Sequence, residues 1–113
     1  VFVDHGKETF SILHKNIEKT GFGGQADCRL SEFEAYLRTA REPFDLIFLD
    51  PPYHKGLSEC ALKLIDERRL LNPGGLIVLE CDGDEEIIIP DSFHQAKKVQ
   101  YGRVKITILK IEE

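Results

Sequence analysis

The order of apolar and amphipathic segments constrains the fold more than any other feature of the sequence. Short runs that predict strands fall at residues 1–4, 25–30, 44–49 and 76–81. Between them, apolar side chains at helical spacing predict helices over residues 7–20, 31–39 and 57–68. Strands that alternate with helices form a mostly parallel sheet, because right-handed crossovers pack the helices onto both faces. We therefore expect an α/β fold with a doubly wound sheet.

The end of the chain departs from this alternation. Residues 93–102 and 103–110 alternate polar and apolar side chains around Tyr101 and Gly102, which predicts a closing antiparallel hairpin. The strand at 44–49 is apolar at nearly every position, as expected of a central parallel strand covered by helices on both faces. With 113 residues, 42% of them hydrophobic, residues 1–113 are assigned to a single domain.

Composition and charge exclude several classes of protein. Every apolar run is too short to cross a bilayer and the chain does not open on a signal peptide, so we expect a cytoplasmic protein that binds no membrane. The three cysteines stand far apart and the four histidines are scattered, which argues against disulfides and against a metal site. The net charge of -5 is not typical of a chain that grips nucleic-acid phosphates by itself.

Acidic residues are expected where three of the predicted strands end. They are Asp4, Asp27 beside Cys28, and Asp50. In sheets of this type ligands bind beyond the carboxyl ends of the strands. A carboxylate in the place of Asp4 can accept hydrogen bonds from both hydroxyls of a ribose, or it can cap the helix that begins near Lys7. Position alone leaves both roles open.

The D-P-P-Y element consists of Asp50, Pro51, Pro52 and Tyr53. Consecutive prolines stiffen the backbone and donate no hydrogen bonds, so nearby carbonyl oxygens and the Asp50 carboxylate can accept the N–H bonds of an amino group. Tyr53 offers a face on which a flipped base can stack, worth roughly 1 to 3 kcal/mol. The alternative, a strand stop before a helix, is less favoured because an aspartate and an almost wholly apolar strand precede the prolines. Glu80 also ends a predicted strand, where a carboxylate can border the pocket, but it is interpreted as an ordinary strand-end carboxylate.

Four stretches together resemble a known family: VFVD at 1–4, FDLIFLDPPYHKG at 44–56, LLNPGGLIVLECD at 70–82 and YGRVKITIL at 101–109. They are similar to the class I methyltransferases that modify the exocyclic amine of a guanine in 16S ribosomal RNA with S-adenosylmethionine. The D-P-P-Y element alone is shared with adenine amino-methyltransferases of DNA or RNA. The flanking YHKG and the closing hairpin favour the ribosomal RNA branch.

The resemblance implies a Rossmann-like methyltransferase fold and roles for particular residues. Asp4 would hold the cofactor ribose, and Asp27 with Cys28 would lie beside the cofactor adenine, unless the local register places Arg29 there. Residues 50–53 would orient and stack the target base. The implied partner is 16S ribosomal RNA or the small ribosomal subunit.

The sequence departs from the family in one respect. A glycine-rich loop of the D-x-F-A-G-S-G kind cradles the methionine part of the cofactor, and it would lie roughly 20 residues before Asp4. Gly21, Gly23 and Gly24 follow a predicted helix and cannot replace it. We therefore expect a fragment that lacks the first strand of the sheet, with a central gap closed by re-pairing or by self-association through exposed sheet edges. A non-catalytic remnant of the fold is a further alternative, and basic residues that grip RNA could lie in the missing arm.

Overall fold

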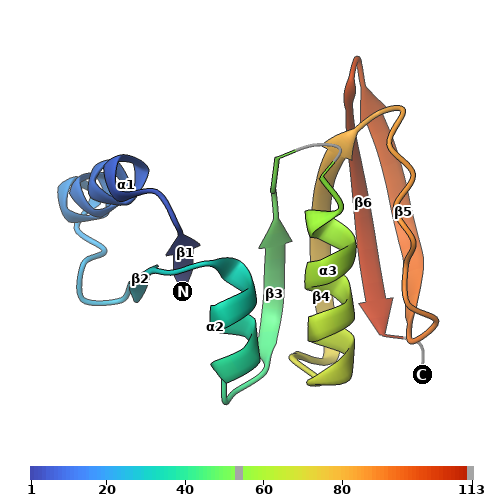
Figure 1. Ribbon diagram of the computed structural model, residues 1–113, viewed down its shortest axis with the longest axis horizontal. Helices are drawn as coiled ribbons and strands as arrows, with labels where there is room; N and C mark the ends of the chain where they lie inside the picture. The colour runs from blue at the N-terminus through green and yellow to red at the C-terminus, as the bar shows by residue number, and fades with distance from the viewer. Residues whose placement is uncertain (53–54, 112–113) are drawn as a thin grey trace. The chain divides into compact units, whose positions relative to one another are not determined.

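The computed structural model describes residues 1–52 and 55–111 and divides the chain into two compact units, Val1–Thr39 and Ala40–Glu113. The elements are β1 (Phe2–Asp4), α1 (Lys7–Thr20), β2 (Cys28–Leu30), α2 (Phe33–Thr39), β3 (Phe44–Leu49), α3 (Leu57–Glu67), β4 (Leu71–Asp82), β5 (Phe93–Tyr101) and β6 (Val104–Ile111) (Figure 1). The alternation of strands and helices and the closing hairpin are thus confirmed. The assignment to a single domain stays a prediction.

The first unit is built on a short parallel pair of strands. β1 pairs with β2 in a register that sets Asp4 opposite Leu30, and α1 connects the two strands and contacts both. α1 ends at Gly21, which has a φ of 80° and is therefore in the left-handed region that glycine adopts without strain. β2 is shorter than the strand predicted over residues 25–30, which matters for the placement of the site residues.

The second unit contains a mixed four-stranded sheet in the order β3-β4-β6-β5. β3 and β4 are parallel and are connected by α3, whereas β4, β6 and β5 pair in antiparallel fashion. Figure 1 shows α3 lying along one face of this sheet, in front of β4. The parallel crossover and the hairpin that turns at Gly102 agree with the sequence pattern. β4 begins at Leu71, before the strand predicted at 76–81, so the N-P-G-G residues 72–75 lie within it.

The core of the second unit lies between α3 and the sheet face that it covers. Four positions of α3 turn inward because they recur at helical spacing. The buried apolar residues of α3 are Ala61, Leu62, Leu64 and Ile65, and those of the sheet include Ile77, Leu79, Cys81, Phe93 and Leu109. Alternate residues of β4 are buried from Gly75 to Cys81, so one face of this strand forms the core.

The environment of β3 corrects the prediction of a strand covered on both faces. β3 is an edge strand that pairs with β4, and Leu46 and Phe48 are 62% and 64% exposed. The predicted closure of the sheet by re-pairing or by self-association stays a prediction. The apolar run correctly predicts a strand, but its coverage depends on neighbours that the run does not encode. Among the described helices, none is long and apolar enough to cross a membrane.

Candidate active site

Asp50 and the two prolines lie at the carboxyl end of β3. The strand ends at Leu49, so Asp50 is the first residue beyond it, and it is exposed rather than turned into the core. Pro51 is partly buried and Pro52 is exposed. Both residues lack a backbone N–H, so this turn presents acceptors rather than donors. Tyr53 lies outside the described residues, and its stacking role stays a prediction.

Glu80 lies beside Asp50, a relationship that sequence reasoning missed. The parallel register aligns Leu49 with Leu79, so the next residues of β3 and β4 are Asp50 and Glu80. A hydrogen bond between their carboxyl groups, together with partial desolvation and the negative charge of Asp50, raises the pKa of Glu80. Glu80 therefore lies beside the D-P-P-Y element, near the carboxyl ends of β3 and β4, which we call the D-P-P-Y edge. The sequence does show an acidic residue near the end of the next strand, but it does not give the register between β3 and β4 that brings this residue beside Asp50.

Asp4 ends β1 and binds the turn before α1. The Gly6 N–H donates to Asp4 Oδ1 at 3.1 Å. This hydrogen bond, followed by one from the Thr9 side chain, lowers the pKa of Asp4 and keeps its carboxylate ionised. Gly6 itself is the N-cap of α1, and α1 has no side-chain cap. Asp4 thus secures the turn ahead of the helix, and its role as a ribose acceptor stays a prediction.

Asp27 and Cys28 lie at the amino end of β2, which corrects their predicted placement. β2 begins at Cys28, so Asp27 precedes the strand, and its carbonyl accepts the Phe2 N–H at 2.8 Å. Asp4 lies at the opposite, carboxyl end of this parallel pair. The cofactor-binding roles predicted for Asp27 and Cys28 rested on a strand ending there. The residues on either side of this strand are polar, so the sequence carries no clear signal that the strand starts at Cys28.

The Asp27 carboxylate is engaged by Arg29. Arg29 Nε and Nη2 donate to its two oxygens at 2.8 and 3.0 Å. This bidentate ion pair lowers the pKa of Asp27, and it also places Arg29 at the amino half of β2. The residues that do follow β2 are Ser31 and Glu32. The Ser31 N–H donates to the Asp4 carbonyl at 2.9 Å, so this segment borders Asp4.

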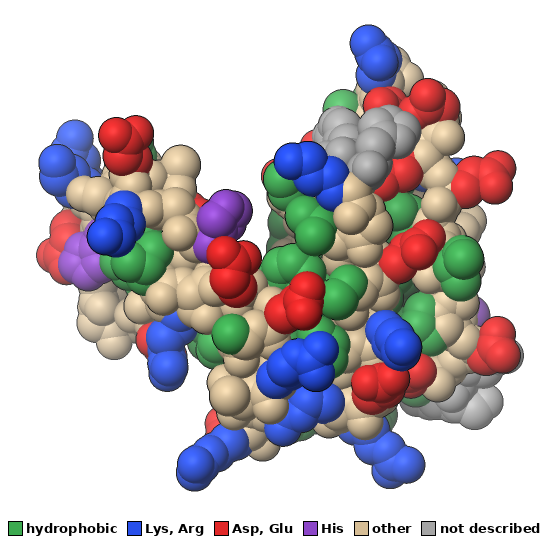
Figure 2. Space-filling view, viewed as in Figure 1, with side chains coloured by type: hydrophobic (Ala, Val, Ile, Leu, Met, Phe, Trp, Pro, Cys, Tyr) green, Lys and Arg blue, Asp and Glu red, His purple; other side chains and the backbone are tan. Residues whose placement is uncertain are grey.

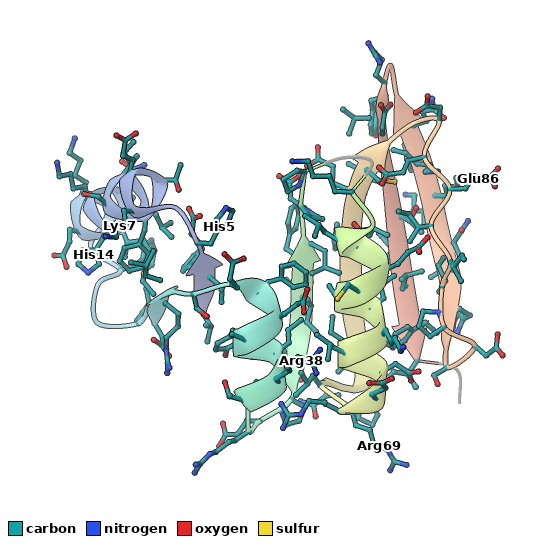
Figure 3. The ribbon with its side chains drawn as sticks, in the orientation of Figure 1. His5, Lys7, His14, Arg38, Arg69 and Glu86 are labelled. Carbon is teal, nitrogen blue, oxygen red and sulfur yellow. The ribbon has the colours of Figure 1, made fainter. Side chains whose placement is uncertain are left out.

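The described histidines lie at or on different elements. Figure 3 shows His5 after β1 and His14 on α1, whereas His94 lies on β5 in the other unit. Within residues 1–52 and 55–111, no group of His, Cys, Asp and Glu side chains is arranged to hold a metal ion. Figure 3 also shows Glu86 on the segment between β4 and β5.

The charges around the candidate site are mixed in sign. On the face of the second unit shown in Figure 2, acidic and basic side chains alternate over α3 and the strands. A cavity of about 240 Å³ lies under the segment between β4 and β5. It is lined by Leu79, Glu86, Ile87, Ile89, Gln95, Lys98, Lys105 and Thr107. Asp50 and Glu80 are absent from this lining, so the cavity is separate from the D-P-P-Y edge.

Comparison with known proteins agrees with the resemblance seen in the sequence. A family profile described as conserved hypothetical protein 95 matches residues 1–110. The ribosomal RNA small subunit methyltransferase D of Buchnera aphidicola is 30% identical over 92 residues, which cover 81% of this chain and 48% of that protein. The chain therefore spans about half the length of this curated relative.

Solved structures support the same fold. A conserved hypothetical protein from Streptococcus pyogenes superposes with a TM-score of 0.89 and 26% identity, covering 97% of this chain and 69% of that one. A methyltransferase from Podospora anserina, solved with S-adenosylhomocysteine (SAH) bound, gives a TM-score of 0.77 at 16% identity over 98% of this chain and 59% of that one. The fold is thus that of class I methyltransferases, and the chain belongs to the family described as conserved hypothetical protein 95.

Proposed function

We propose that the protein transfers a methyl group from S-adenosylmethionine to the exocyclic amine of a guanine in 16S ribosomal RNA. The observation that carries this proposal is the exposed Asp50, held at the carboxyl end of a parallel strand and followed by two prolines. The name of the Buchnera relative supports ribosomal RNA as the substrate class. The SAH in the Podospora structure supports the cofactor. The proposed location is the cytoplasm.

The described residues fit the ribose end of this cofactor. Asp4 is an ionised carboxylate at the carboxyl end of a parallel strand, where α/β proteins hold nucleotide riboses. Ser31 and Glu32 follow the neighbouring strand and border Asp4, so we assign them to the same part of the site in place of Asp27 and Cys28. Gly21, Gly23 and Gly24 follow α1 and do not open a helix, so they are not assigned to the methionine part.

The D-P-P-Y edge would position the amine. When bound, the cofactor supplies a methyl group activated on a sulfonium sulfur, so the protein has to orient the nucleophile and remove a proton. The Asp50 carboxylate would accept one N–H of the amine, and the stiff Pro51–Pro52 turn would keep backbone carbonyls available for the other. Tyr53 is proposed to stack on the flipped base.

The test uses the longest polypeptide that the gene encodes, with 16S ribosomal RNA and labelled S-adenosylmethionine. Asp50→Ala should lower the transfer rate about 100-fold or more, because it removes the acceptor of the amine proton, while cofactor affinity measured by calorimetry stays unchanged. Glu42→Ala, which removes an exposed carboxylate shortly before β3, is the matched control. Unchanged transfer in Asp50→Ala would show that the element is a strand stop.

The methylated product identifies the base. Nucleoside analysis by mass spectrometry should yield a methylated guanine amine. A methylated adenine would replace this proposal with the adenine branch, and absence of cofactor binding by the wild-type polypeptide would favour the non-catalytic alternative.

A further inference from the structure

Two acidic side chains meet at the carboxyl ends of β3 and β4. Leu49 and Leu79 are aligned partners, so Asp50 and Glu80 occupy the next position on two adjacent strands, about 4.8 Å apart in a regular sheet. Their carboxyl groups are close enough to share a hydrogen bond when one of them is protonated, and this interaction raises the pKa of Glu80. The two residues are therefore placed so that a proton taken up by one can be shared with the other.

Among the described residues, the neighbours of the pair on β4 and β6 offer little positive charge to compensate two negative charges. Glu80 is partly buried, and the residue that pairs with it on β6 is Ile106. On β4 the next side chain on the same face is Asp82, which Arg103 approaches at 4.0 Å. From β3, Asp50 is the charged group that faces Glu80. The interaction with the Asp50 side chain, desolvation and the negative charge of Asp50 all favour the protonated form of Glu80 and raise its pKa.

We propose that Asp50 and Glu80 act together as the acceptor of the proton that the substrate amine loses on methylation. This inference rests on the proposed function. In the reaction, the amine lone pair forms the N–C bond, the C–S bond of the donor breaks with its electrons left on sulfur, and one N–H bond breaks. Asp50 accepts that proton directly, and the hydrogen bond to Glu80 then stabilises the protonated pair. Glu80 is thus a positioning residue that acts through Asp50.

The first test measures the pair itself, without cofactor or RNA. Carboxyl carbons of the 113-residue chain are followed by NMR as the pH is changed. Glu80 should titrate above the ordinary range of glutamate, and Asp50→Asn should lower its midpoint, as expected for coupled carboxyl groups. Glu42→Gln, which removes an exposed charge elsewhere in the unit, should leave the midpoint unchanged. An ordinary midpoint for Glu80 in the wild-type chain would overturn the proposal whether or not the variants fold.

The second test asks whether the pair controls methyl transfer. Single-turnover rates of the longest polypeptide that the gene encodes are measured against pH. The wild-type rate should fall in acid as the pair becomes protonated, and Glu80→Gln should move this fall to lower pH because it removes one of the two charges. An equal loss of rate at every pH would indicate a structural role and overturn the proposal. If the wild-type protein carries the coupled pair but methylates no RNA, the proposed function fails while the pair itself stands.

Discussion

Two leucines on neighbouring strands test whether one face of β3 is open in solution. Leu79 on β4 is 1% exposed and Leu46 on β3 is 62% exposed. Leu79→Ala removes buried methyl groups and leaves a cavity, so it should lower the free energy of unfolding by about 2–5 kcal/mol. Leu46 already has most of its surface in water, so the same truncation should cost less than about 1 kcal/mol. Both variants replace a leucine with alanine, so they differ in how deeply that leucine is buried.

The assay is urea unfolding of the chain, followed by circular dichroism at several protein concentrations. The midpoint of the wild-type chain and of Leu46→Ala should be nearly equal and should not depend on concentration. If Leu46→Ala costs as much as Leu79→Ala, Leu46 is covered in solution and the argument from its exposure is wrong. A midpoint that rises with concentration would instead identify the cover as a second copy of the chain.

Two further predictions concern the backbone and the charges. Gly56 precedes α3 with a φ of 69°, and a Cβ added there would meet no other atom. Gly56→Ala should therefore destabilise the protein by about 1–2 kcal/mol in thermal unfolding because of the backbone strain alone. Gly24 is also unobstructed but has no positive φ, so Gly24→Ala should change stability by less than about 0.5 kcal/mol. Equal effects would mean that φ is not the cause. Arg29→Gln should raise the pKa of Asp27 toward its usual value, as measured by NMR, because the bidentate ion pair lowers it. A lowered folded-state pKa gives stability that is present at neutral pH and lost as the pH falls through that pKa, so this acid-dependent loss should shrink in the variant. An unshifted Asp27 would show that the ion pair does not form in solution.

Most of the fold could be predicted because it follows from local patterns. Apolar spacing located α1 and α3, Gly21 marked the end of α1, and alternation on either side of Gly102 predicted the hairpin. The order of these elements then required a parallel crossover between β3 and β4. Each of these signals lies within a window of a few residues, so no distant contact was needed to interpret it.

The parts that could not be predicted depend on distant neighbours. The apolar run of β3 gave no information on what covers Leu46 and Phe48. β2 has only three residues, so its polar flanks allowed a start at residue 25 and placed Asp27 at the wrong end of the strand. The contact of Asp50 with Glu80 depends on the register between strands that α3 separates in sequence. The D-P-P-Y element itself was visible because its residues are consecutive.

The irregular pairing at the start of β4 governs which way Glu80 points. Between the pairs Phe44–Leu71 and Leu46–Leu76, β3 advances two residues and β4 advances five. Gly75 is confined there, since a Cβ would approach the Asp45 carbonyl oxygen at 2.8 Å. Side chains of a strand alternate between faces, so losing one residue from this stretch without a compensating change would rotate the rest of β4 by half a turn. The spacing of an inconspicuous N-P-G-G stretch therefore sets the orientation of the acidic edge, and this stretch should tolerate substitution at its exposed positions far better than a change in length.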